Sequence, residues 1–372
     1  MNSVNEKRII DLFKRLVETD SPSRGERQVC DLVKKELEKL GIEPIEDSAG
    51  EKIGGNAGNI YAYIDGDIDL PPILFSAHMD TVEPSSNKKM IIDEDGRIHS
   101  DGTTVLGSDD FAGITSIIEA LAVIRENKLS HRPIELLFSV CEEQCGGGAD
   151  VADYDKIKSK EAYVFDLDGS AGTACYAAPT ILTFKAEFKG RAAHAGLDPE
   201  NGIHAIRAAS LAISRIECGK IDGTTVNIGT LKGGVANNIV PEHCVFTGEI
   251  RSYDDEKVTE RYELIEDIIR RSAEEFGASV ETESFRGIIA YETDLEHPVV
   301  QRFTNACDAM KIESKLERSF GGSDNNVFAL YGIKGLVLST AMNDCHTTNE
   351  WTTVNDLKGA AELALTLMLS KE

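Results

Sequence analysis

The stretch ILFSAHMDTVEP, residues 73–84, ends a run of apolar and small residues in a histidine, His78, and a carboxylate, Asp80. The run has the composition of a buried strand, and Pro84 marks a turn after it. In open α/β sheets, binding and catalytic groups gather where the strands end. The stretch therefore predicts a sheet strand that carries His78 and Asp80 to a functional edge.

Helices and strands alternate on both sides of this strand, which is typical of an α/β sheet with crossover helices. Two amphipathic helices open the chain, and the α/β pattern returns after residue 290. The predicted helices cover 5–19, 24–42, 109–127, 297–312 and 354–372, and the predicted strands cover 59–65, 71–78, 132–141, 160–168 and 334–340.

The middle of the chain has a different pattern. Residues 180–190 alternate apolar and polar side chains, as a half-exposed antiparallel strand does. Further strands are predicted over 224–234 and 243–254, and helices over 201–217 and 255–278. We expect two helices on a four-stranded sheet there. The sequence thus predicts a mostly parallel-sheet α/β catalytic domain in two segments, 1–179 and 290–372, with an α+β domain, 180–289, inserted between them.

Composition limits the partners and the compartment. The formal net charge is −25, from 39 basic and 64 acidic residues, so nucleic acid and anionic membranes would be repelled and are not expected partners. No apolar run approaches the roughly 20 residues of a membrane-spanning helix, and the N-terminal residues lack the apolar centre of a signal peptide. The eight cysteines are scattered, unlike those of a small disulfide scaffold. We therefore expect a cytoplasmic protein.

Ionisable side chains stand near the ends of the predicted strands. Taken singly, each has an ordinary explanation, such as a helix cap for Asp109 or Asp110. Together they would repel one another strongly unless cations neutralised them. Imidazole and carboxylate ligands suit Zn²⁺ and similar ions, and two ions that share a carboxylate form a hydrolytic pair. A metal site is therefore predicted among His78, Asp80, Asp109, Asp110, Glu142, Glu143, Asp166, Asp168 and His346.

Several motifs point to one family. In chain order they are HMDTV, LGSDDFAGI, CEEQCGGGA and HTTNE, with FKGRAAHAG and GGSDNN between the last two. Together they resemble the dizinc M20 metallopeptidases, and among these the peptidase T-like tripeptidases. The resemblance covers essentially the whole chain. It implies a parallel-sheet zinc-peptidase catalytic domain and an inserted dimerisation (lid) domain that pairs two subunits into a homodimer.

The resemblance also implies a cofactor and its ligands. Two Zn²⁺ ions per subunit are expected, or Co²⁺ or Mn²⁺ in their place. For one ligand the choice stays open: the AYVFD pattern favours Asp166, whereas Asp168 precedes a glycine as that ligand often does. The implied ligands are His78, Asp109 and Asp166 for one ion, and Asp109, Glu143 and His346 for the other.

Two further carboxylates have expected catalytic roles. Asp80 is two residues beyond His78 and on the same side of an extended chain, so its carboxylate is expected to accept a hydrogen bond from the imidazole. Glu142 resembles the family's general base, which takes a proton from the zinc-bridging water and delivers it to the leaving amine.

The resemblance implies substrate-binding residues as well. His194 resembles a histidine that reaches into the partner's site and stabilises an oxyanion, although a plain surface histidine is the alternative. Arg251 resembles an arginine that clamps a substrate carboxylate, with a surface ion pair to Asp254 or Asp255 as the alternative. The full expected set is His194, Asn238, Arg251, Gly322 and Ser323.

We therefore expect a zinc aminopeptidase that acts on small peptides, with tripeptides first. A deacylase or carboxypeptidase using the same two metal ions, acting on N-acyl amino acids or C-terminal residues, is the alternative. A third hypothesis, a non-catalytic peptide or metal binder, is disfavoured because Glu142 and every expected ligand are present.

Overall fold

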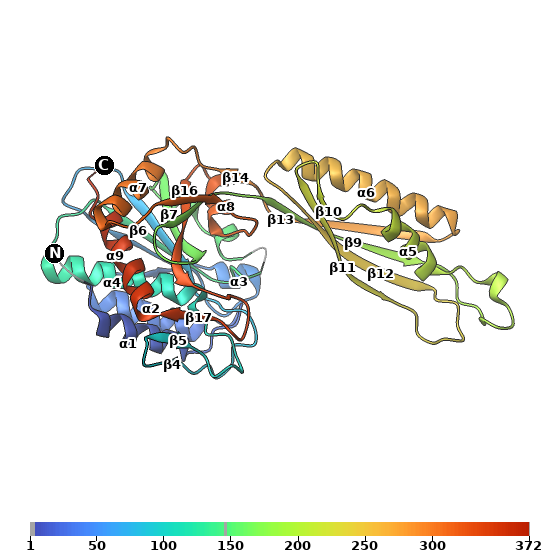
Figure 1. Ribbon diagram of the computed structural model, residues 1–372, viewed down its shortest axis with the longest axis horizontal. Helices are drawn as coiled ribbons and strands as arrows, with labels where there is room; N and C mark the ends of the chain where they lie inside the picture. The colour runs from blue at the N-terminus through green and yellow to red at the C-terminus, as the bar shows by residue number, and fades with distance from the viewer. Residues whose placement is uncertain (1–3, 145–146, 372) are drawn as a thin grey trace. The chain divides into compact units, whose positions relative to one another are not determined.

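The computed structural model describes residues 4–144 and 147–371. The chain forms two compact units, and Figure 1 labels most of their helices and strands. Unit 1 comprises Met1–Ala177, Glu292–Ser319 and Ser323–Glu372. Unit 2 comprises Ala178–Tyr291 and Phe320–Gly322. In the described part of the chain, no helix is both long and apolar enough to span a bilayer.

Unit 1 is built on a nine-stranded sheet in the order β1-β2-β6-β3-β7-β16-β8-β14, with β15 paired to β8. The four central strands β6, β3, β7 and β16 run parallel to one another. The strands are β1 (Ile45–Glu46), β2 (Ile60–Ile64), β3 (Ile73–His78), β6 (Ile134–Ser139), β7 (Glu161–Asp168), β8 (Thr173–Ala178), β14 (Tyr291–Glu292), β15 (Lys315–Arg318) and β16 (Lys334–Met342).

Both faces of this sheet are covered, because successive strand residues point to opposite faces and both sets are apolar. Phe75 and Ala77 of β3 enter one core, and Leu74 enters the other. The second core includes Phe328 of α8 (Asp324–Leu330). The first core receives α1 (Glu6–Val17), α2 (Arg27–Lys39), α4 (Ser108–Asn127), α7 (Pro298–Met310) and α9 (Val354–Met368).

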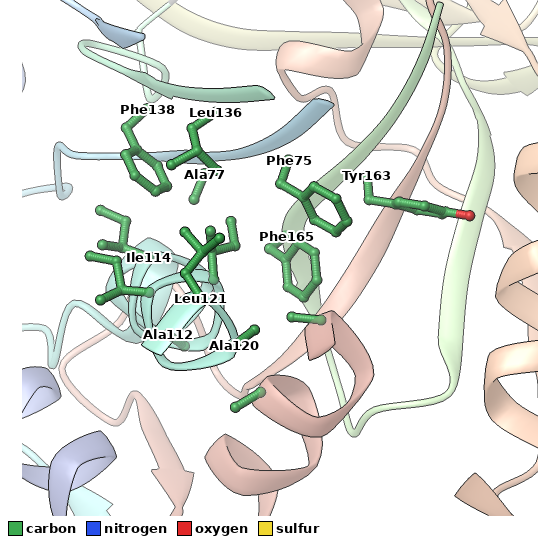
Figure 2. Close-up of a cluster of buried hydrophobic side chains, with 14 of the residues drawn as sticks. Phe75, Ala77, Ala112, Ile114, Ala120, Leu121, Leu136, Phe138, Tyr163 and Phe165 are labelled. Atoms are coloured by element: carbon green, nitrogen blue, oxygen red, sulfur yellow. The ribbon is translucent and has the colours of Figure 1, made fainter. Parts of the chain in front are cut away.

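Helix α4 packs against the centre of the sheet. It is buried on every side from Ser108 to Ile124, and most of these residues are apolar, as expected for a helix in the interior. Figure 2 shows its side chains, Leu121 among them, beside Phe75 and Phe165 of the sheet. The rings of Phe75 and Phe165 are 6.2 Å apart between centroids. This packing fixes the N-terminal end of α4, which carries Asp109, against the end of β3.

A second, three-stranded sheet in unit 1 has the order β17-β5-β4. It pairs a segment that follows β3 with one near the C-terminus: β4 (Ile91–Ile92), β5 (Arg97–His99) and β17 (Trp351–Thr353). Thr353 then caps α9, since its hydroxyl accepts a hydrogen bond from the Asp356 N–H at 3.0 Å. The short helix α3 (Ala49–Ile53) completes the α-helices described in this unit.

Unit 2 is a five-stranded antiparallel sheet in the order β10-β11-β12-β9-β13. A four-stranded sheet was expected with only three strands placed, so β10 and β13 were both missed. β10 has three residues, too few to show an alternating pattern. Alternate residues of β9, such as Phe184 and Phe188, form a core with two helices. The elements are β9 (Thr180–Lys189), α5 (Ala205–Arg215), β10 (Gly219–Ile221), β11 (Thr224–Gly233), β12 (His243–Ser252), α6 (Asp255–Glu275) and β13 (Ser279–Ile288).

One edge of this sheet is largely free. β10 pairs only with Thr224–Val226 of β11, so within the described chain the stretch 227–233 has no strand beyond it on that side.

The predicted fold class, a mostly parallel α/β sheet with an inserted α+β unit, is confirmed.

Candidate metal centre

The ends of the parallel strands in unit 1 bring ionisable side chains to one edge of the sheet. His78 is the last residue of β3, and Asp166 lies near the end of β7. Glu142 and Glu143 follow β6, and His346 follows β16. Because these strands are parallel neighbours, their carboxyl ends lie side by side. The expected site is therefore a product of sheet topology.

Asp109 lies between the two imidazoles. Its Oδ1 is 2.9 Å from Nε2 of His78, and its Oδ2 is 3.1 Å from Nε2 of His346. Potential ligand atoms form two groups, each within 4.8 Å: His78, Asp109 and Asp166, and Asp109, Glu143 and His346. Asp109 belongs to both groups, as a bridging carboxylate would.

Asp166 and Asp168 differ in their position relative to His78. Oδ1 of Asp166 is 3.7 Å from Nε2 of His78. Asp168 is exposed and belongs to neither of the groups found among the described residues. In the second group, Oε2 of Glu143 is 3.0 Å from Nε2 of His346. All five expected ligands are thus brought together.

The charges of this site call for cations. Burial raises the pKa of Asp166 and that of Glu142 well above their ordinary values, because a buried carboxylate loses its hydration. Hydrogen bonds to Asp109 and Glu143 raise the pKa of His346 to about 10. Oε1 of Glu143 is buried and has no hydrogen-bond partner among the described residues. These residues, with imidazole nitrogen and carboxylate oxygen as donors, fit a pair of divalent ions such as Zn²⁺.

Asp80 supports both a ligand and the segment with the expected base. Nδ1 of His78 is 3.0 Å from the Asp80 main-chain oxygen and 3.3 Å from its Oδ1. The main-chain oxygen is therefore closer to the imidazole than the carboxylate oxygen that was expected to accept its hydrogen bond. The carboxylate accepts hydrogen bonds from the N–H groups of Glu142 (2.9 Å) and Glu143 (3.3 Å) and from the Ser23 hydroxyl (2.7 Å). Asp80 therefore holds His78 and the turn that carries Glu142.

Sequence reasoning missed a second support of that turn, Glu26. Its Oε1 accepts hydrogen bonds from the N–H groups of Arg24 (2.7 Å) and Cys141 (3.0 Å). Cys141 has a φ of 59°, in the left-handed region that non-glycine residues seldom adopt. The partners are 115 residues apart in sequence, so no local pattern could have linked them.

Asp110 is also a support rather than a helix cap alone. Its carboxylate accepts hydrogen bonds from the N–H groups of His78 and Gly113, both at 3.1 Å. The Asp109–Asp110 peptide bond is cis. Asp110 therefore ties the end of β3 to the start of α4.

In unit 2, His194 and Asn238 lie on adjoining segments. Nδ1 of His194 accepts hydrogen bonds from the N–H groups of Gly196 and Leu197, both at 3.1 Å. This arrangement assigns the ring proton to Nε2, the nitrogen that can donate to a ligand. The Asn238 carbonyl accepts from the Ala195 N–H at 3.0 Å. Both His194 and Asn238 are exposed.

Arg251 has partners within unit 2 that differ from the alternative expected from sequence. Its Nε and Nη2 donate to the Glu249 carboxylate at 2.9 and 3.1 Å, and its Nη1 donates to the Phe320 carbonyl at 2.6 Å. Asp254 instead caps α6 through the N–H groups that follow it. A substrate carboxylate would have to compete with Glu249 for this guanidinium.

The last two expected substrate residues differ in exposure. Gly322 is exposed. Ser323 is buried and caps α8, its hydroxyl accepting a hydrogen bond from the Asn325 N–H at 3.3 Å. The Ser323 hydroxyl thus already has a structural partner.

Comparison with known proteins gives a consistent result. A model of the M20 peptidase dimerisation domain matches residues 176–276, and a model of peptidase family M28 matches residues 59–190. The uncharacterized protein YqjE of Bacillus subtilis is 35% identical over 366 residues, covering 98% of each chain.

Two solved structures match nearly the whole length of this chain. The aminopeptidase PepT from Bacillus cereus has a TM-score of 0.91 and 35% identity, with 98% of each chain covered. A tripeptidase from Staphylococcus aureus has a TM-score of 0.95 and 31% identity, again with 98% of each chain covered.

Proposed function

Because the chain belongs to the M20 family, as a peptidase T-like metallopeptidase, we propose that it removes the N-terminal residue of short peptides, tripeptides above all. The names of two solved relatives, an aminopeptidase and a tripeptidase, support this substrate class. The free N-terminal ammonium of such a substrate is compatible with an acidic protein of net charge −25.

The observation that carries this proposal is the position of Asp109 between two groups of potential ligands. We propose that one Zn²⁺ binds to His78, Asp109 and Asp166, and a second binds to Asp109, Glu143 and His346. Zn²⁺ accepts this mixture of imidazole and carboxylate ligands, and Co²⁺ or Mn²⁺ are the alternatives. When bound, the ions would lower the pKa of water and polarise the scissile carbonyl.

Glu142 is the proposed general base. It adjoins Glu143 without belonging to either ligand group. The Asp80 carboxylate fixes its backbone by accepting a hydrogen bond from the Glu142 N–H at 2.9 Å. The carboxylate takes a proton from the attacking water and later delivers it to the nitrogen of the leaving amine. Burial raises the pKa of Glu142, which suits a group that must hold a proton between these two steps.

Unit 2 would supply the groups that hold the substrate. His194 can donate its Nε2 proton to the carbonyl oxygen as charge develops on it, and Asn238 can bind the peptide backbone. Arg251 would bind the C-terminal carboxylate of the substrate. In the substrate-free protein, hydrogen bonds to Glu249 set the orientation of its guanidinium. Gly322 would offer its backbone N–H to the peptide terminus, and Ser323, which belongs to unit 1, would offer its hydroxyl proton.

A homodimer is proposed as the working form, with His194 serving the partner subunit's site. The match of 176–276 to a peptidase dimerisation domain supports pairing. The unpaired edge of β11 over 227–233 is suited to strand pairing between two copies. Every described cysteine is a free thiol, which supports the proposed cytoplasmic location.

Hydrolysis of a free tripeptide beside its N-acetylated twin tests the proposed function. The zinc-loaded protein should cleave only the free peptide, and a chelated sample should cleave neither until zinc is restored. Cleavage of only the acetylated peptide would replace the proposal with deacylation at the same centre. Equal rates in chelated and zinc-loaded samples would contradict metal-dependent hydrolysis.

A further inference from the structure

Glu350 is a buried carboxylate that lies against residues 107–109, the loop at the start of α4, where Asp109 has non-helical backbone angles (φ −82°, ψ 102°). It immediately precedes β17, and only 1% of it is exposed. Its Oε2 accepts a hydrogen bond from the Gly107 N–H at 2.7 Å. Its Oε1 accepts from the Ser108 hydroxyl at 2.6 Å and from the Asp109 N–H at 3.0 Å. Both oxygens are therefore used to hold three consecutive residues of the loop.

These hydrogen bonds stabilise the buried carboxylate of Glu350. Burying a carboxylate without compensation is strongly unfavourable. The three hydrogen bonds compensate Glu350, together with the positive charge of Lys88, with which it interacts electrostatically. The loop itself is constrained: Gly107 has a φ of 80°, and a Cβ there would stand 3.0 Å from the Thr81 side chain. Glycine adopts this φ without strain, so the backbone at Gly107 can direct its N–H to Glu350.

The same turn also carries a potential metal ligand. His346 and Glu350 lie four residues apart, and the Glu350 N–H bonds to the Thr347 carbonyl at 3.2 Å. His346 contacts one oxygen of Asp109 at 3.1 Å, while Glu350 holds the backbone N–H of Asp109. A shift of Asp109 would change its distance to His346 and, through its other oxygen, to His78.

We propose that Glu350 is a positioning residue that fixes the carboxylate of Asp109 between the two metal ions, so that it controls the affinity of both. This inference rests on the proposed function, because it assumes a pair of ions at Asp109. Outer residues that orient metal ligands commonly change affinity about ten- to a hundredfold when they are replaced.

Glu350→Gln is the variant for the test. Glutamine offers one acceptor oxygen and one amide nitrogen. In either orientation, an amide N–H would face the backbone N–H of Gly107 or of Asp109. Glu135→Gln is the matched control: Glu135 is equally buried in unit 1, and its carboxylate accepts from the Lys158 and Ser159 N–H groups far from the ligand groups.

The experiment measures zinc affinity of the full-length protein by competition with a chelator, the absorption spectrum of the Co²⁺-loaded protein, and kcat and KM in saturating zinc. Glu350→Gln should bind both ions ten- to a hundredfold more weakly, change the Co²⁺ spectrum, and lower kcat with little effect on KM. Glu135→Gln should lower thermal stability while leaving the affinity and the spectrum unchanged.

If Glu350→Gln does not fold, Gly107→Ala provides the second arm, because it displaces the same loop while keeping Glu350. It should reproduce the loss of affinity for both ions; wild-type affinity in this variant would overturn the inference. If wild-type protein binds two ions and Glu350→Gln binds them as tightly with the same spectrum, the inference alone fails. Fewer than two ions in the wild-type protein would reject the proposed function itself.

Discussion

Replacing Glu26 by glutamine measures how the ionisation of one buried carboxyl group, beside the proposed metal centre, contributes to the free energy of unfolding. Glu26 is fully buried, and its Oε2 has no hydrogen-bond partner among the described residues. A glutamine carbonyl can take the place of Oε1 and accept the same hydrogen bonds from Arg24 and Cys141. The substitution therefore removes the ionisation of this side chain and keeps its contacts.

The magnitude follows from the pKa. Burial raises the pKa of Glu26 from 4.5 to about 7, and the charge of Asp80 adds to the effect. Between these values the folded state keeps a proton that the unfolded state releases, so the contribution of Glu26 to stability falls as pH rises. A shift from 4.5 to about 7 corresponds to roughly 3 kcal/mol at most. Above the pKa of the folded state, the contribution of Glu26 to stability no longer changes with pH.

Urea unfolding of metal-free protein measures this effect, with fluorescence of Trp351 as the signal. Trp351 is the only tryptophan of the chain and lies in unit 1, as Glu26 does. The free energy of unfolding of Glu26→Gln, relative to wild type, should rise by up to about 3 kcal/mol between pH 4.5 and pH 8. A chelator at every pH removes differences in metal release.

Glu26→Ala provides the control curve. It cannot ionise either, so its difference from wild type should follow the same pH trend. Because alanine loses both hydrogen bonds, its curve should lie below that of Glu26→Gln by a constant amount. A Glu26→Gln difference that is the same at pH 4.5 and pH 8 would refute the reasoning.

Four other substitutions test the proposed roles. Glu142→Gln should retain zinc and lower kcat by several orders of magnitude, because the base is lost while the ligands remain; parallel loss of zinc and activity would assign it a ligand role instead. Asp166→Asn should remove one zinc per subunit, measured by metal analysis after dialysis, whereas Asp168→Asn should keep both, and the reverse pattern would exchange their roles. His194→Ala should keep its zinc and lower kcat on a free tripeptide by about 10²–10³-fold, and an unchanged kcat would reduce His194 to a surface residue.

Local patterns were sufficient for the main elements of the fold. The apolar run before His78 became β3, which is buried along its length, and the apolar 109–127 segment became α4. Both are long or strongly patterned, so packing reinforces the local signal. β10 lacked such a pattern because it has only three residues.

The candidate site was predictable where a chemical group stands at a strand end, and less so where geometry decides. Asp166 and Asp168 are two residues apart on β7 and point to the same side. Alternation cannot separate them, whereas the sheet places only Asp166 beside His78. The pairing of Arg251 with Glu249 was within reach, because residues two apart on β12 share a face.

The supports of the site come from tertiary structure. Glu350 reaches the Asp109 N–H across 241 residues, and Glu26 reaches Cys141 across 115. Hydrogen bonds between such distant residues leave no periodic trace in a single sequence. Glu350 even stands inside the HTTNE motif that identified His346, but only the folded loop reveals what its carboxylate binds.

The central claim is that two metal ions share Asp109. Diffraction from zinc-loaded crystals, measured on both sides of the zinc absorption edge, tests it most directly. We expect two anomalous peaks per subunit, one beside His78 and Asp166 and the other beside Glu143 and His346, with Asp109 between them. A single peak, or peaks away from Asp109, would contradict it.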